Sequence, residues 1–285
     1  MKMQIECTVC FMEQAARAAR LSCADRQTQL KALREAARLI ASLDESRTPP
    51  ETATDIFRAV ADITGNPDGF RELKAASNNA VKKLTGELSL LISESSDPLE
   101  TAVKVSLCGN IIDYGIFDDY DLDSLIREET RKPADRKGVE KIREAAKGSG
   151  KIAFLADNAG EIGLDALLLD ELKKLNPDLE ITVLVKSAPI INDATREDAE
   201  FFGIDKRYPV YETPATVGVR VPDLTGRGSA AVKEADWIIA KGQANYELLS
   251  ETSLSRVIYL LRAKCGVVAR DTGVKVNTPL IIVKE

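Results

Sequence analysis

The stretch KIAFLADNAGEIGLD at residues 151–165 decides the fold, because a short apolar run ends abruptly in polar residues and a glycine. Residues 152–156 predict a strand buried on both faces, which is typical of parallel sheets, and residues 162–175 predict the helix that follows it. The same pattern recurs, with strands expected at residues 181–185, 237–240 and 256–261 and helical segments between them. Alternating strands and helices indicate an α/β fold with a Rossmann-like, mostly parallel sheet. A last apolar run at residues 279–283 is expected to add an edge strand.

The first part of the chain has a different pattern, without convincing strand alternation. Apolar residues at helical spacing predict helices over residues 24–43, 48–65 and 67–93, and another from residue 97 to residue 108. We therefore expect an N-terminal all-α helical domain at residues 1–125 and an α/β metal-binding catalytic domain at residues 126–285. The acidic stretch at residues 118–123 is the expected hinge or loop between them, since charge runs are usually solvated.

Composition excludes several classes of chemistry. The 285 residues contain no histidine, so Ser-His-Asp and Cys-His nucleophiles, HExxH zinc sites and phosphohistidine are all ruled out. A formal net charge of −6 argues against a general nucleic-acid polymer as partner. The first twenty residues lack an uninterrupted apolar segment, and no apolar run approaches the roughly 20 residues that span a bilayer. We expect a cytoplasmic protein without a membrane partner.

Polar residues follow three of the expected strands, where ligands bind in open parallel sheets. Asp157 and Asn158 follow the first strand, and Asp193 lies in the loop after the second. Two carboxylates and an amide oxygen are suitable ligands for a hard divalent metal such as Mg²⁺ or Mn²⁺. Helix capping is the alternative for Asp157 and Asn158, and the two roles are not exclusive. A metal-activated water would supply a nucleophile without histidine.

Further residues at the same strand ends are candidates for contacts with an anion. Gly160 lets the backbone approach a ligand, and the helix that starts there presents free N–H groups. Lys186 and Lys241 are candidates to neutralise phosphate oxygens, although each alone is more typical of a surface charge. Asn110 and Asp113, in the segment CGNIIDYG at residues 108–115, are expected to reach the crevice from the helical part, with a helix C-terminal turn as an equally good interpretation.

The cysteines form a weaker pattern. Cys7 and Cys10 make one CxxC, with Cys23 thirteen residues later. One CxxC is not a zinc signature, and a redox motif usually follows a strand, which is absent here. Partly buried thiols are the favoured interpretation, ahead of a structural metal or a redox role.

Other enzyme signatures are missing. The residue two positions after Asp157 is Ala159, so the haloacid-dehalogenase nucleophile pair is not present. No Walker A loop or GxGxxG follows any expected strand, which argues against P-loop hydrolysis and a dinucleotide cofactor.

Taken together, the motifs resemble those of a known family. The CxxC at Cys7 and Cys10, GNxxDYG at residues 109–115, DNAGE at 157–161, VKSAPIINDAT at 185–195 and KGQANYE at 241–247 resemble the damage-control phosphatase family, long catalogued as domain of unknown function 89. The CxxC is similar to that of its subfamily I. The resemblance covers essentially the whole chain.

This resemblance implies a helical domain packed on a Rossmann-like domain and a metal-dependent phosphatase, a hydrolase of phosphoric monoesters. It implies Asp157, Asn158 and Asp193 as metal ligands, with manganese, nickel or cobalt as the metal and magnesium also workable. The implied substrates are small phosphorylated metabolites, either sugar phosphates or, for subfamily I, damaged purine nucleotides or their biosynthetic intermediates. The RTxK motif of the sugar-phosphate branch is missing, and Lys241 is our candidate to replace its phosphate contact.

The resulting hypothesis assigns two sets of residues. The catalytic set comprises the three metal ligands, Glu161, expected to orient water or a ligand, and Lys241. The substrate side comprises Asn110, Asp113, Gly160, Lys186, Ser187, Gly242, Asn245 and Glu247. Two alternatives remain: a non-catalytic metal- or nucleotide-binding module, and a carboxylate methyltransferase, which DNAGE fits poorly because adenosylmethionine pockets usually open with a glycine-rich loop.

Overall fold

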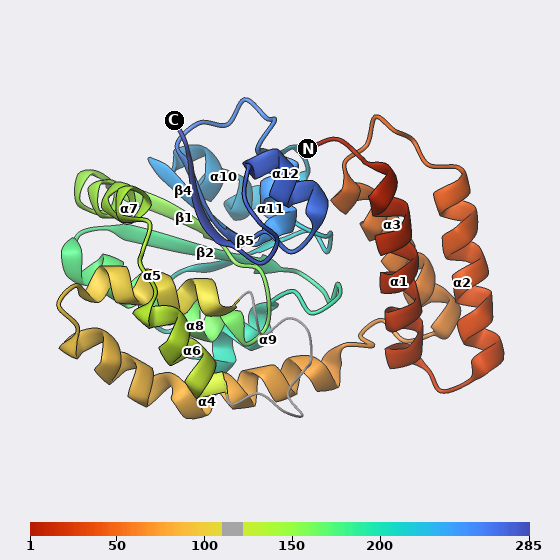
Figure 1. The fold of residues 1–285 in the computed structure, drawn as a ribbon, viewed down its shortest axis with the longest axis horizontal. Helices are drawn as coiled ribbons and strands as arrows, with labels where there is room; N and C mark the ends of the chain where they lie inside the picture. Colours follow the sequence, from red (N-terminus) through yellow and green to blue (C-terminus); the bar gives the residue numbers. More distant parts are fainter. Residues whose placement is uncertain (110–121) are drawn as a thin grey trace.

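The computed structural model describes residues 1–109 and 122–285 and has the expected α/β architecture (Figure 1). Helices precede the first strand, and strands alternate with helices after it. The helices before the sheet are α1 (Ile5–Ser22), α2 (Arg26–Ala41), α3 (Pro49–Thr64), α4 (Arg71–Glu94), α5 (Pro98–Cys108), α6 (Leu122–Arg131) and α7 (Arg136–Gly148). Then follow β1 (Lys151–Leu155), α8 (Glu161–Leu175), β2 (Glu180–Lys186), α9 (Arg196–Phe201), β3 (Val210–Thr213), η2 (Val221–Asp223), α10 (Gly226–Glu234), β4 (Trp237–Lys241), α11 (Gln243–Leu249), β5 (Val257–Arg262), α12 (Gly266–Thr272) and β6 (Pro279–Lys284).

The sheet has the strand order β3-β2-β1-β4-β5-β6. The first five strands run parallel, and β6 pairs antiparallel with β5 as the expected edge strand. The order reverses between β1 and β4, so the loops after these two strands diverge and leave a crevice. Sequence analysis did not identify the opposite edge strand β3, which is only four residues long and carries polar residues.

Alternating side chains divide the interior into two apolar cores. Ile152 and Phe154 of β1 pack with α4, α5, α7 and α8 on one face. Ala153 and Leu155 pack on the other face with α10, α11 and α12, and that core continues into α1, α2 and α3. Burial of every strand residue from Ile152 to Leu155 explains the continuous apolar run in the sequence.

The helices α1, α2 and α3 form a lobe beside the sheet, and α4 extends from below that lobe to the helices under the sheet (Figure 1). Thr48 and Glu51 form a capping box at the start of α3, and Gly65 ends it in a left-handed conformation, as the sequence predicts. Helix α1 was not predicted. Helices α4 and α5 share one apolar core with the sheet, and α1, α2 and α3 share the other. The domain boundary at residue 125 stays a prediction. Within the described ranges, no helix is both long and apolar enough to cross a bilayer.

Candidate active site

The loop after β1 is held against the loop after β2 by backbone hydrogen bonds. Asn158 and Asp193 form an isolated antiparallel bridge, and the Ala194 amide donates to the Asp157 carbonyl at 2.8 Å. Ile191 has a positive φ of 47°, a strained conformation for a β-branched residue, in the chain that leads to Asp193. These contacts bring the three predicted metal ligands together from two separate loops.

A third loop, after β4, reaches the same point through Gly242. Its φ is +80°, and a Cβ built on it would lie 2.0 Å from Oδ2 of Asp157. Only glycine therefore allows this loop to approach the Asp157 carboxylate. Gly242 is part of the site through this close approach.

A side chain on Gly160 would also clash with a neighbouring segment, which here is α4. A Cβ on Gly160 would lie 2.9 Å from the Ser77 Cβ, and its N–H donates to Oδ1 of Asn78 at 2.6 Å. The N–H of Gly160 is therefore already bound by α4, and the prediction that the N–H groups of the following helix bind an anion stays a prediction. The glycine allows α4 to pack closely on the loop.

The Asn158 side chain is oriented by two acidic groups. Its Nδ2 donates to Oδ2 of Asp157 at 2.8 Å and to Oε2 of Glu161 at 3.1 Å. This orientation leaves its Oδ1 without a hydrogen bond in the described parts of the chain. An amide oxygen beside the Asp157 and Asp193 carboxylates is an all-oxygen donor set that suits a hard divalent cation.

The acidic groups are buried close together, and this changes their protonation. Burial, with the neighbouring charges of Glu161 and Asp193, raises the pKa of Asp157 well above its usual value. Burial also raises the pKa of Asp193 to about 6, although Lys186 opposes this shift. A bound cation would favour the charged forms of both carboxylates, so the electrostatics of the site fit a metal. Among residues 1–109 and 122–285, no cluster of three His, Cys, Asp or Glu side chains is suited to a metal.

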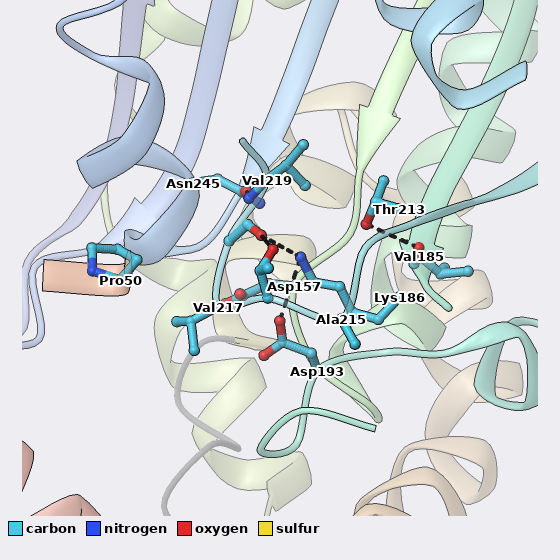
Figure 2. A network of polar contacts seen from close by, with 12 residues as sticks. Pro50, Asp157, Val185, Lys186, Asp193, Thr213, Ala215, Val217, Val219 and Asn245 are labelled. Atoms are coloured by element: carbon cyan, nitrogen blue, oxygen red, sulfur yellow. Dashed lines mark hydrogen bonds and ion pairs between the residues drawn. The ribbon is translucent and has the colours of Figure 1, made fainter. Parts of the chain in front are cut away.

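Lys186 forms an ion pair with Asp193, one of the three predicted metal ligands. Figure 2 shows its side chain between Asp193 and the loop that follows β3. Its Nζ donates to the Gly218 carbonyl at 2.6 Å and lies 3.7 Å from Oδ2 of Asp193. Burial lowers the pKa of Lys186, while Asp193 opposes that change. Lys186 therefore compensates the charge of Asp193 and does not line the cavity described below.

Asn245 and Ser187 were predicted to lie on the substrate side, but neither lines the cavity described below. Asn245 is fully buried, accepts a hydrogen bond from the Val219 amide at 2.8 Å (Figure 2) and donates to the Lys241 carbonyl at 2.8 Å. It therefore fixes the loop that accepts from Lys186. The Ser187 side chain is exposed, and its amide pairs with Thr213.

The prediction that Lys241 contacts phosphate is wrong in this structure. Lys241 is fully buried, and its Nζ lies 3.1 Å from Glu161 Oε1 and 2.8 Å from Asp165 Oδ1. It also donates to the Ser106 hydroxyl at 2.6 Å. Burial opposes the charge of Lys241, but the two carboxylates outweigh it and raise its pKa. Burial raises the pKa of Glu161 to about 7, against the effect of Lys241.

The end of α5 encloses this buried cluster. A Cβ on Gly109 would lie 2.4 Å from Cγ of Glu161, so the glycine lets α5 pack directly on that side chain. Asn110 and Asp113, the next predicted site residues, lie outside the described residues.

A cavity of about 340 Å³ opens in front of the metal-ligand set. Its walls include Asp157, Asn158 and Asp193 on one side and residues of α1 and α3 on the other. The described cationic residues of the wall are Arg17 and Lys264, and the predicted residue Glu247 also lines it. Burial lowers the pKa of Lys264 to about 7 and raises the pKa of Glu247 to about 7. We call this space the active-site cavity.

The CxxC also faces this cavity. Cys7 and Cys10 line it from α1, and Cys265 lines it from the start of α12. All three are free thiols, as is Cys23. Burial raises the pKa of both Cys7 and Cys10, so these thiols are protonated at neutral pH.

Sequence reasoning missed three groups that shape the site: Asn78, Asp165 and Lys264. Asn78 links Gly160 to Asp198, which lies 3.0 Å from Lys74. A signal for Asp165 was present, because it lies one turn after Glu161 in an otherwise apolar stretch of α8. Lys264 lies two residues after the end of β5. The rule that selected Asp157, that polar residues after strand ends form the site, would therefore also have selected Lys264.

Comparison with known proteins identifies the family of this chain. The family model described as the damage-control phosphatase ARMT1-like domain matches residues 3–280. The chain belongs to this family. A damage-control phosphatase of Archaeoglobus fulgidus is 36% identical over the full length of both chains. The damage-control phosphatase PH1575 of Pyrococcus horikoshii is 32% identical over 96% of this chain and 95% of its own.

The solved structures give the same result. The crystal structure of the Pyrococcus horikoshii family protein superposes with a TM-score of 0.91 at 30% identity and covers both chains completely. The predicted damage-control phosphatase family and its Rossmann-like fold are therefore confirmed. The assignment to subfamily I through Cys7 and Cys10 stays a prediction.

Proposed function

We propose that this damage-control phosphatase family member is a metal-dependent phosphatase that hydrolyses phosphoric monoesters of small metabolites. Family membership indicates a phosphatase. The observation that carries the finer proposal is the meeting of Asp157, Asn158 and Asp193 on the wall of a cavity that also contains the cationic Lys264. A metal-ligand set and a phosphate-binding cation at one cavity are the parts that phosphate ester hydrolysis requires.

Asp157, Asn158 and Asp193 would hold a divalent metal, with manganese, nickel or cobalt proposed and magnesium workable. When bound there, such a metal supplies Lewis-acid polarisation of a phosphoryl oxygen and lowers the pKa of water. The protein's own contribution is to hold the two carboxylates and the amide oxygen in place before the metal arrives. The backbone bridge between the loops and the Asn158 hydrogen bonds do this.

The surrounding residues act by position and charge. Glu161 accepts from Asn158 and is itself held by Lys241, so it fixes the orientation of the amide ligand. Lys186 compensates the charge of Asp193. Lys264, on the cavity wall, is the proposed contact for the phosphate group and stabilises the charge that develops during its transfer.

The cavity wall also limits the substrate. Phe11, Phe57 and Phe70 line the active-site cavity together with Arg17, so apolar and aromatic side chains share this space with the proposed metal ligands. A volume of about 340 Å³ is at the lower end of the range for small-molecule sites, about 300–1,000 Å³. These features support a compact phosphorylated metabolite with a planar ring, such as a damaged purine nucleotide or a biosynthetic intermediate. Sugar phosphates are the second candidate class.

The experiment is hydrolysis of para-nitrophenyl phosphate by metal-stripped protein, with Mg²⁺, Mn²⁺, Co²⁺ or Ni²⁺ added back. The expected result is metal-dependent activity that Asp157→Asn and Asp193→Asn each abolish. Asp178→Asn is the matched control, because Asp178 is exposed and outside the cavity. Activity without metal, or full activity in both site variants, would overturn the proposal. Metal binding without turnover of any phosphate ester would indicate a binding module instead, and binding of adenosylmethionine would indicate a methyltransferase.

A further inference from the structure

One face of α1 runs along the active-site cavity. Its lining residues lie three or four positions apart on the helix: Cys7, Cys10, Gln14 and Arg17. The N-terminal end of α1 lies beside α12, because Glu6 forms an ion pair with Arg270. The C-terminal end lies beside the connection from α3 to α4, where Asn66 donates a hydrogen bond to the Ser22 carbonyl. The cavity therefore extends along α1 between these two segments.

The described cations of the cavity wall lie toward its two ends. Lys264 lies two residues before the start of α12, close to the N-terminal end of α1. Arg17 lies in the second half of α1, ten residues or about 15 Å along the helix axis after Cys7. A substrate whose phosphate group contacts Lys264 would therefore present its other end to Arg17.

The Arg17 guanidinium has an aromatic neighbour but no acidic one. It lies over the ring of Phe70, with Cζ 6.0 Å from the ring centroid. It forms no hydrogen bond or ion pair with residues 1–109 or 122–285. Its side chain is half-buried, so it is held on the wall and stays accessible from the cavity. The N–H donors of Arg17 are therefore available to a ligand.

A guanidinium in this setting suits a particular kind of group. Its planar fork of donors matches two adjacent acceptor atoms, which it binds with two parallel hydrogen bonds. Phe11, Phe57 and Phe70 line the same cavity, and aromatic side chains bind planar rings by stacking. A planar ring with two adjacent acceptors on its edge meets both requirements. The O6 and N7 atoms of a 6-oxopurine are such a pair, and arginine binds both at once.

We propose that Arg17 is a specificity-determining residue, which selects phosphorylated substrates with a 6-oxopurine ring through its two adjacent acceptors. This inference rests on the proposed function, because the metal ligands and Lys264 place the phosphate group. Arg17 then binds the ring end of the same substrate. A 6-aminopurine presents a donor at position 6, so it offers the guanidinium one acceptor and opposes a donor with a donor.

The test compares the isosteric 5′-phosphonates of inosine and adenosine, in which a CH₂ group replaces the ester oxygen and prevents release of phosphate. Their purine rings differ only at position 6 and the adjacent N1. Each is titrated calorimetrically into the full chain in the presence of Mn²⁺. The inosine phosphonate should bind the wild type about tenfold more tightly than the adenosine phosphonate. Arg17→Lys keeps the charge but loses the fork of donors, so this preference should fall to about twofold or less.

Arg20→Lys is the matched control, since Arg20 is an exposed arginine of the same helix and does not line the cavity. It should leave the tenfold preference unchanged. The inference is overturned if the wild type binds the two phosphonates equally, or if Arg17→Lys and Arg20→Lys show the same preference. Turnover of para-nitrophenyl phosphate tests the proposed function separately, because the phosphonate preference is read from binding alone. Arg17 forms no hydrogen bond with the rest of the described chain, so Arg17→Lys should fold.

Discussion

Gly242 and Asp157 lie so close that a single methyl group on the glycine would come within 2.0 Å of the aspartate carboxylate. The two residues belong to the loops after β4 and β1, the adjacent strands at which the order of the sheet reverses. This contact links the topology of the fold to the proposed metal ligands. It also provides the first test of the site.

Gly242→Ala should abolish activity through displacement of Asp157. Its φ of +80° also makes alanine strained, by about 1–2 kcal/mol of unfolding free energy. Gly203→Ala is the matched control, because Gly203 has a φ of +66° and open space around its Cβ position. Both variants should lose stability from backbone strain in urea unfolding, Gly242→Ala more because its Cβ also meets Asp157, and only Gly242→Ala should lose metal affinity and turnover. Equal activity in the two variants would show that the close approach is unimportant.

Lys241→Met should reduce stability, because it leaves the buried Glu161 and Asp165 without their cation. Breaking a buried ion pair from one side typically costs about 3–5 kcal/mol. Urea unfolding measures the loss, and the added substitution Asp165→Asn should recover part of it. A fully stable Lys241→Met protein with poor substrate binding would instead restore the phosphate-contact role first expected from the sequence.

Lys264→Ala should lower kcat/KM about 100-fold, as removal of a group that stabilises transferring charge typically does. Burial sets the pKa of Lys264 at about 7, so its positive charge is present below that pH and is lost above it. The kcat/KM of the wild type should therefore fall as pH rises through 7. Lys264→Arg keeps the charge and should remove this limb of the profile. Lys233→Ala controls for loss of a distant cation, and an unchanged profile in Lys264→Arg would contradict the assignment.

Glu247→Gln tests the buried acid on the cavity wall. Burial raises its pKa in the folded protein to about 7 from an ordinary value of 4.5, so the folded state holds the proton more tightly than the unfolded state. The stabilising contribution of Glu247 is present below about pH 4.5 and is lost as pH rises through 7. Glu247→Gln should therefore have little effect at pH 4.5 and stabilise the protein by about 3 kcal/mol at pH 8. Urea unfolding at the two pH values measures the free energy of unfolding of Glu247→Gln and of the wild type. An equal difference between the two proteins at both pH values would contradict the raised pKa of Glu247.

The sequence predicted the parallel sheet and the metal-ligand set through one rule, that polar residues after buried parallel strands meet at the same edge. That rule placed Asp157, Asn158 and Asp193 correctly beside one another. It failed for Lys241, since a lysine at a strand end can point either into the crevice or into the protein. The partners of the buried Lys241 side chain lie on α5 and α8. The spacing of residues within one loop does not predict contacts with these distant helices.

Contacts between distant segments explain the other differences. Asn78, 82 residues before Gly160, accepts a hydrogen bond from the Gly160 N–H, and this contact has no signal in the local sequence. Cys7 and Cys10 face the active-site cavity only because α1 packs across from the sheet loops. Helix α1 itself was missed, although its buried side chains, including Phe11 and Ala15, lie at helical spacing.

The central claim is that Asp157, Asn158 and Asp193 hold a divalent metal at the active-site cavity. The most direct measurement is a crystal structure of the protein with Mn²⁺, with an anomalous difference map to locate the ion. We expect one strong peak with oxygen ligands from these three side chains at about 2.0–2.3 Å, which is lost in Asp193→Asn. A peak bound elsewhere, or an empty site in crystals of protein that is active with manganese, would contradict the claim.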